Sequence, residues 1–193
     1  MRVITSSWSL VFVLAVIAMS IRANSTTIPA YSMEDLVRAA DLVVMGHASK
    51  IEHQRDKRGK TVRKVTFEVD QYVVGSGKSA IEIKLFGGTL DGVVSKVSGE
   101  ADLPLNRPTL LFVRASQTDE SVYHIVGMAQ GHFRIILDPK TQSRFVTRSL
   151  TKDLHLINEI KNDKMGLGST RTSSFIPFEQ FISEIRRLQD TQR

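Results

Sequence analysis

The chain has 193 residues, of which 41% are hydrophobic and 24% are charged. These values are typical of an ordinary globular domain with a core of its own, and they exclude a chain that is disordered throughout. The formal net charge of +6 is modest for this length and does not indicate a nucleic-acid partner. The absence of cysteine excludes disulfides, thiolate metal sites and cysteine nucleophiles.

The start of the chain predicts a secretory signal peptide over residues 1–23. Arg2 precedes an apolar run that ends at Met19, and small or polar residues follow. A basic start, an apolar middle and a small-residue exit are typical of an export signal. The run has about 12 residues, fewer than the roughly 20 of a membrane-spanning helix, and a retained anchor is the alternative. We therefore expect an exported protein, periplasmic or extracellular, with no transmembrane segment after cleavage.

The middle of the chain predicts a β domain over residues 32–150, after a flexible lead-in at residues 24–31. Ser32 and Asp35 have nearly the spacing of a capping box, which predicts a short helix to about residue 40. Beyond it, apolar and polar side chains alternate, and a period of two is typical of half-buried strands. Strands are predicted at residues 42–51, 64–74, 80–86, 109–115 and 144–147, with two more that meet near residues 129–131.

The stretch GSGKS, residues 75–79, shares its last half with the nucleotide-binding motif G-x-x-x-x-G-K-[ST]. Tyr72 stands where that motif requires its first glycine. The stretch also lies between two alternating strands, whereas a nucleotide-binding loop leads from a strand into a helix. We therefore predict a hairpin turn with a solvated Lys78 and no nucleotide.

Residues 151–193 predict a helical appendage. Residues 153–160 have helical apolar spacing, and a last helix is expected to start at Pro177. One stripe of this last helix is apolar, formed by Phe178, Phe181, Ile182, Ile185 and Leu188. Such a stripe predicts packing against the sheet, with a partner-binding helix as the alternative.

No motif in the chain predicts catalysis, a cofactor or a metal site. The histidines lack the spacing of metal ligands, although a zinc site built from His47, His124 and His132 across the fold stays open. No G-x-S-x-G motif marks a serine nucleophile. Asp91 and Glu100 lie in the same irregular segment, residues 87–108, where a small hydrolase site is the least favoured alternative.

Two segments are candidates for binding. Between residues 50 and 64, seven basic side chains oppose two acidic ones. Such a hairpin could contact an anionic surface or an acidic protein, with a solvated turn that protects a strand edge as the alternative. The long segment 87–108 is the second candidate, since loops of that length are usually functional or mobile. The binding residues expected from both are Arg55, Lys57, Arg58, Lys60, Gly87, Gly88, Asp91 and Gly92.

The segments EDLVRAADLVVMGHASKIE, KVTFEVDQYVVGSG, AIEIKLFGG, LLFV and VGMAQGHFRI resemble a largely uncharacterised group of small exported bacterial proteins. This resemblance covers about residues 33–137 and implies no particular activity. Residues 40–44 and the pattern up to Gly75 are more distantly similar to the inhibitory domain of tissue inhibitors of metalloproteinases and to netrin-like modules. That likeness implies a five-stranded OB-type barrel. Inhibition in that family uses an N-terminal cysteine, which this chain lacks.

The sequence as a whole predicts a mainly β fold, an antiparallel OB-like barrel or strongly curved sheet with a short helix before it and one or two helices after it. The favoured function is that of an exported, non-catalytic protein that binds a macromolecular partner through loops at one rim. The expected partner is another exported protein, or else an anionic envelope surface. The alternative is an inhibitor or accessory of a secreted protease that uses a loop in place of a chelating cysteine.

Overall fold

The structure is a computed structural model that describes residues 26–148, 154–157 and 175–192. Its described strands are β1 (Thr26–Pro29), β2 (Leu42–Arg55), β3 (Thr61–Val74), β4 (Ala80–Phe86), β5 (Gly88–Leu90), β6 (Val93–Ser95), β7 (Thr109–Ser116), β8 (Asp119–Ile125), β9 (His132–Leu137), β10 (Arg144–Arg148), β11 (Leu154–Ile157) and β12 (Ile176–Pro177). The described helices are α2 (Met33–Ala39), the 3-10 helix η1 (Met128–Gly131) and α3 (Phe178–Thr191). The predicted mainly β class is confirmed, whereas the predicted signal peptide lies outside the described residues.

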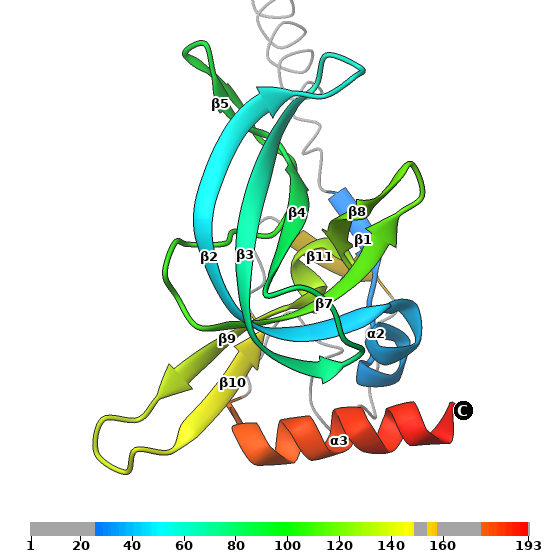
Figure 1. Cartoon of the computed structure of the whole chain (residues 1–193), viewed down its shortest axis with the longest axis vertical. Helices are drawn as coiled ribbons and strands as arrows, with labels where there is room; N and C mark the ends of the chain where they lie inside the picture. Colours follow the sequence, from blue (N-terminus) through cyan, green and yellow to red (C-terminus); the bar gives the residue numbers. More distant parts are fainter. Residues whose placement is uncertain (1–25, 149–153, 158–174, 193) are drawn as a thin grey trace, which may run out of the picture.

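Eight strands form one mixed sheet in the order β12-β10-β9-β7-β2-β3-β4-β8 (Figure 1). Neighbours in this order are antiparallel except β4 and β8, which pair in parallel. One edge of β7 pairs with β9 along its first half and with β8 along its second half, while β2 takes the other edge. The predicted OB-like barrel is not confirmed, and β9, β10 and β12 extend the sheet beyond the first half of that shared edge.

Strand β2 changes partners at Gly46. Up to this residue β2 lies between β7 and β3, and beyond it β2 pairs with β3 alone apart from one bridge between Ala48 and Leu105. The register with β3 shifts at three places near this point, and such irregularities bend and twist a strand. A Cβ atom at position 46 would overlap the carbonyl oxygen of Glu68 and lie 2.9 Å from a ring carbon of Phe67. Glycine therefore allows the close approach of the two strands.

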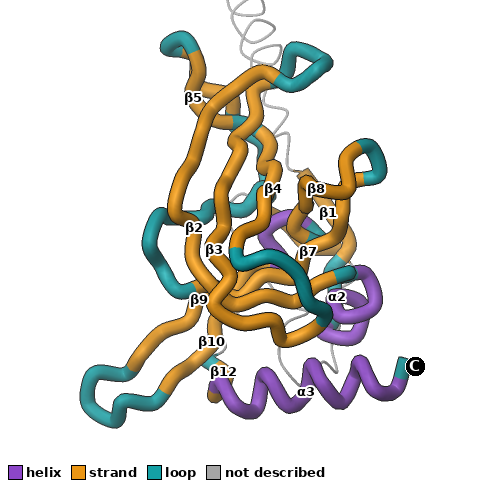
Figure 2. The backbone as a smooth tube through the Cα atoms, in the orientation of Figure 1, coloured by secondary structure: helices purple, strands orange, loops and turns teal. Residues whose placement is uncertain are grey.

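Beyond Gly46, three strands continue together as an arm, which consists of residues 47–55 of β2, 61–68 of β3 and 80–86 of β4. Figure 2 shows β2 and β3 as a long pair of strands that extends well beyond β7. Within the arm, Val65 and Phe67 are fully buried, as their alternation predicts. The arm thus carries the turn between β2 and β3 away from the helices.

Two hydrophobic clusters lie on opposite faces of the sheet. Along β7, Leu110 and Phe112 belong to one cluster, and Leu111 and Val113 belong to the other. Helices α2 and α3 cover the first face, and the inner face of the arm packs on the second. Strand β7 is therefore buried on both faces, which explains its continuous apolar run.

The capping box of the first predicted helix and the apolar stripe of the last one are confirmed. Ser32 Oγ accepts the N–H of Asp35 at 3.1 Å, and the Asp35 carboxylate accepts the N–H of Ser32 at 3.1 Å, which completes the capping box of α2. Helix α3 buries all five side chains of its predicted apolar stripe. Its Phe181 ring lies 4.9 Å from that of Phe133, centroid to centroid. Because the stripe is buried against the sheet, the alternative of a free partner-binding stripe is wrong.

Two predictions near the ends of the chain are wrong. The lead-in predicted at residues 24–31 contains β1, and the helix predicted at residues 153–160 contains β11. These two strands pair in parallel, with Thr26 opposite Leu154. Each obtains its partner from the far end of the chain, and no local pattern reveals such a pairing.

The stretch of residues 75–79 forms the turn between antiparallel β3 and β4, as predicted. The N–H of Val69 donates to the carbonyl of Ser79 at 2.7 Å, and Lys78 is exposed. The helices that the structure describes are too short or too polar to span a bilayer.

His132 is a fully buried titratable side chain at the start of β9. Neither ring nitrogen has a hydrogen-bond partner among the described residues. Burial, and secondarily the charge of Arg134, lowers the pKa of His132 from 6.5 to about 4. The imidazole is therefore neutral in the folded protein near pH 7.

We predict that the stability of the protein falls as the pH drops from about 6.5 to about 4. The unfolded chain binds a proton at His132 in this window and the folded chain does not, which removes up to about 3 kcal/mol from the free energy of unfolding. Urea unfolding of the wild type and of His132→Leu at several pH values measures this. The variant is expected to lose less stability than the wild type between about pH 6.5 and about pH 4. If the free energy of unfolding depends on pH in the same way in both proteins, His132 is not the group responsible.

Candidate functional site

The turn between β2 and β3 is preorganised by Asp56. Its Oδ1 accepts the N–H groups of Arg58 and Lys60, both at 2.9 Å, and its N–H donates to the Lys60 carbonyl at 2.9 Å. Lys84 lies 3.5 Å from the other carboxylate oxygen. The pKa of Asp56 is lowered, first by the N–H of Lys60 and further by Arg58 and Lys84. The Asp56 side chain is only 13% exposed, and its hydrogen bonds to the backbone stabilise the turn.

Strands β5 and β6 form a second hairpin within the segment that sequence reasoning left irregular. Asp91 and Gly92 connect them, with φ values of 53° and 75°. Positive φ at both central residues is typical of a type I′ turn, for which Asp-Gly is a favoured pair. Val93 and Val94 follow the turn and are 61% and 73% exposed. Both apolar side chains are therefore accessible at the end of this hairpin.

The two hairpins contact each other. The N–H of Thr89 donates to Nδ1 of His53 at 2.9 Å, and the Arg55 guanidinium lies 3.3 Å from the Asp91 carboxylate. We call the turn 55–60 and the hairpin 88–95 together the double-hairpin end. Figure 1 shows it at the end of the molecule opposite α3. Two candidates that lie far apart in the sequence therefore form one surface.

The unpaired positive charge of this surface comes from Lys57, Arg58 and Lys60. All three are exposed, and none forms an ion pair with another described residue. Lys57 acts only at longer range on Asp119, whose pKa is lowered chiefly by hydrogen bonds from Ser121. Because Arg55 is paired with Asp91, the three remaining cations dominate the field around the turn.

The glycines that were predicted as binding residues shape the backbone of the second hairpin. Gly87 is buried with a φ of 78°, and a Cβ atom there would lie 2.5 Å from the carbonyl oxygen of Ser95. A Cβ atom on Gly88 would lie 2.7 Å from Nδ1 of His53. Gly87 and Gly88 therefore let the hairpin fold back onto the arm, while Asp91 and the exposed Gly92 lie at its turn.

The rest of the predicted loop, residues 96–108, is packed on the arm. Ala101 and Leu103 are buried in the cluster of the arm, and the N–H of Asn106 donates to the carbonyl of Ala48 at 2.9 Å. Glu100 accepts the N–H of Phe86 at 2.8 Å. The buried residues of this half therefore anchor it to the arm, whereas the hairpin 88–95 projects from it.

Burial raises the pKa of the Glu100 carboxyl, although the N–H groups of Phe86 and Ala101 act in the opposite direction. Arg63 donates from Nη2 to the carbonyl of Ala101 at 3.0 Å beside it. Asp91, the other acid considered from the sequence, pairs with Arg55 at the far tip. The two acids therefore have separate structural partners.

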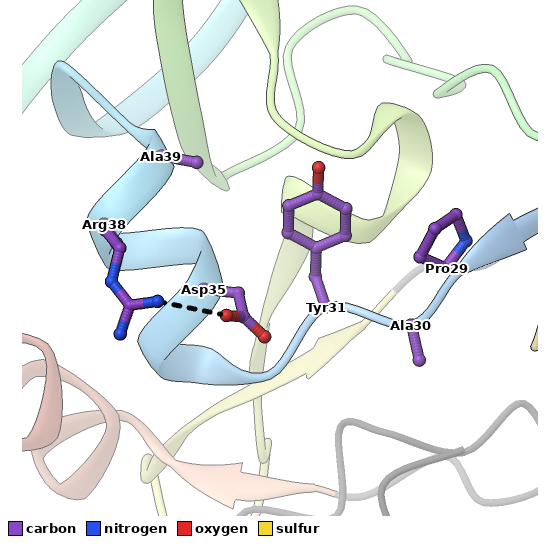
Figure 3. Close-up of a pocket in the computed structure, with 6 residues that line it drawn as sticks. All are labelled: Pro29, Ala30, Tyr31, Asp35, Arg38 and Ala39. Carbon is purple, nitrogen blue, oxygen red and sulfur yellow. Dashed lines mark ion pairs between the residues drawn. The ribbon is translucent and has the colours of Figure 1, made fainter. Parts of the chain in front are cut away.

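A pocket of about 450 Å³ lies beside α2, lined by Pro29, Ala30, Tyr31, Asp35, Arg38 and Ala39 (Figure 3). Its charged side chains already have partners. Asp35 belongs to the capping box, and Arg38 lies 2.6 Å from Glu34 and 3.7 Å from Asp35. The pocket therefore offers few free polar groups for fixing a small molecule.

The zinc alternative gains no geometric support. Among the described residues, no group of three histidine or acidic side chains comes together in a way that could hold a metal ion. His132 is buried between strands, and His124 stacks on Phe86 with ring centroids 5.8 Å apart. No protein-family model matches this chain, and no curated protein matches it.

The sequence did not lead us to include His53, Val93 and Val94 among the residues of the candidate site. The signal for the valines was present, because Asp-Gly between hydrophobic residues, here Leu90 and Val93, predicts a hairpin. His53 gave no signal, since its role depends on an N–H that lies 36 residues further along the chain. The contact between the hairpins is thus a product of the fold.

We predict that His53→Ala loosens the second hairpin without unfolding the protein. The N–H of Thr89 loses its acceptor, and a hydrogen bond of about 1 kcal/mol corresponds to roughly fivefold faster amide exchange. NMR-detected exchange at Thr89 measures this, with His47→Ala on the same strand as the control. Equal exchange at Thr89 in all three proteins would refute the contact.

Proposed function

We propose that this chain is an exported, non-catalytic protein that binds a macromolecular partner through the double-hairpin end. The observation that carries the proposal is the contact between two hairpins, through Thr89 and His53 and through Arg55 and Asp91, at one end of the molecule (Figure 1). On this end the cations Lys57, Arg58 and Lys60 of one turn and the valines Val93 and Val94 of the other hairpin are all exposed. Exposed apolar side chains next to unpaired charge are typical of interaction surfaces. The export signal predicted at residues 1–23 and the absence of cysteine are consistent with a periplasmic or extracellular location.

Two features support binding over catalysis. The acids of the long segment have structural partners, since Asp91 pairs with Arg55 and Glu100 accepts backbone N–H groups. The double-hairpin end also projects from the fold, whereas catalytic groups usually converge in a concave site.

An OB-like relationship is part of the proposal. Strand β8 pairs in parallel with β4 and antiparallel with β7, so the strands β2, β3, β4, β8 and β7 follow one another in a curved series. This order supports a likeness to the OB-type inhibitory domain of tissue inhibitors of metalloproteinases and to netrin-like modules. OB-type folds commonly bind partners through loops, which agrees with a binding role.

The second candidate function is that of an inhibitor or accessory of a secreted protease. The observation that favours it is the β5–β6 hairpin, which presents Val93 and Val94 on a narrow projection. An inhibitor of this kind suppresses the protease at near-equal molar ratio and loses this effect when the two valines are replaced by serine. Binding without suppression favours the first function.

The test of the first function compares the wild type with two variants, each of which replaces five residues by serine. The tip variant replaces Lys57, Arg58, Lys60, Val93 and Val94. The matched control replaces the exposed Lys78, Lys140, Arg186, Leu137 and Phe175, which lie elsewhere. Because few residues of an interface supply most of its binding energy, retention of envelope components on the immobilised tip variant should fall at least about tenfold.

The matched control is expected to retain the same components as the wild type. Equal circular dichroism spectra and melting curves for the three proteins establish that folding is unchanged. Retention by the tip variant equal to that of the wild type would overturn the proposed function.

A further inference from the structure

We propose that the double-hairpin end docks on the surface of an anionic lipid bilayer. This inference deepens the proposed function and rests on it, because it assigns the chemistry of the partner. Lys57, Arg58 and Lys60 contact the headgroups, and Val93 and Val94 enter the boundary between headgroups and acyl chains.

The charge balance of the end favours an anionic surface. Its two acids are neutralised internally, since Asp91 lies 3.3 Å from Arg55 and Asp56 lies 3.5 Å from Lys84. The charged side chains of this end that remain exposed without an ion pair to a described residue are Lys57, Arg58 and Lys60. Neutralised acids remove the repulsion that a carboxylate would meet at an anionic bilayer.

The shape and rigidity of the end support insertion. The cations lie on a turn fixed by three hydrogen bonds around Asp56, and the valines follow a two-residue turn. The contacts His53–Thr89 and Arg55–Asp91 hold the two turns together. The surface is therefore preorganised, and little conformational entropy is lost when both turns meet a plane.

A bilayer fits this end better than an acidic protein does. Stable protein interfaces bury about 800 Å² on each partner and usually centre on aromatic or arginine anchors in pockets. The turn 55–60 and the hairpin 88–95 contain no aromatic residue. Of their two arginines, Arg55 is paired with Asp91, and Arg58 is exposed on the turn. A lipid surface requires only cations for the headgroups and small apolar side chains for the boundary region.

The experiment uses the absence of cysteine in the chain. The protein is recovered after export, its N-terminus is determined by mass spectrometry, and Val94→Cys is labelled with a polarity-sensitive fluorophore. Lys140→Cys, in the turn between β9 and β10, is the matched control label. The vesicles contain either phosphatidylcholine alone or phosphatidylcholine with one third phosphatidylglycerol.

We expect a blue shift of the probe at position 94 with the anionic vesicles and none with the neutral vesicles or at position 140. In the Val94→Cys background, Lys57→Gln with Arg58→Gln and Lys60→Gln should weaken vesicle binding roughly 100-fold. Its matched control, Lys78→Gln with Lys140→Gln and Arg186→Gln, has the same net charge and should bind like the parent. In the unlabelled protein, Val93→Ser with Val94→Ser should weaken binding roughly tenfold without changing its dependence on salt.

The absence of a blue shift at position 94 overturns the inference, and so does an equal shift at position 140. Binding to soluble polyglutamate that matches or exceeds binding to the anionic vesicles identifies an acidic polymer and also overturns it. The proposed function survives these outcomes if the tip variant still loses its envelope partner. It fails separately if that variant retains the partner in full.

Discussion

The close approach of β2 and β3 at Gly46 is the constraint on which the rest of the structure depends. At this residue β2 leaves β7 and continues with β3 and β4 as the arm. A side chain there would overlap the carbonyl of Glu68, so the bend requires glycine. Because of this bend, the first part of β2 belongs to the helix-covered part of the sheet, and its second part leads to the turn 55–60 at the opposite end of the molecule (Figure 1). The position of the double-hairpin end is therefore fixed by an interaction deep in the sheet.

Most of the fold could be predicted from periodicity and capping. The alternation of Val65 and Phe67, the capping pair Ser32 and Asp35, and the stripe of α3 each report a local geometry that the structure contains. The parallel pairing of β1 with β11 could not be predicted, because it joins short segments from opposite ends of the chain. Strand β9 was expected within the barrel and β10 as a further short strand, whereas β12 was not predicted as a strand. The structure places all three beyond β7, whose edge is shared by β8 and β9. The division of one strand edge between two partners depends on tertiary packing, and it leaves no periodic pattern in the sequence.

The site was predicted in part. The basic residues of the turn 55–60 were recognised from charge alone, but charge could not show that Asp91 neutralises Arg55 or that Asp56 is turned inward. The segment 87–108 was treated as one loop. The structure divides it into a projecting hairpin and a packed half anchored by Glu100. Whether a polar loop residue is exposed or anchored depends on contacts with the arm, and those contacts follow from tertiary structure.

The most direct test of this account is the free energy of unfolding of Gly46→Ala, measured by urea denaturation beside Gly92→Ala. The first variant must move the backbone of Glu68, and the account predicts a loss of at least about 3 kcal/mol or failure to fold. Gly92 has open space around it and a φ of 75°, so alanine there should cost only about 1–2 kcal/mol. A Gly46→Ala protein as stable as Gly92→Ala, or more stable, would contradict the claim that this close approach shapes the molecule.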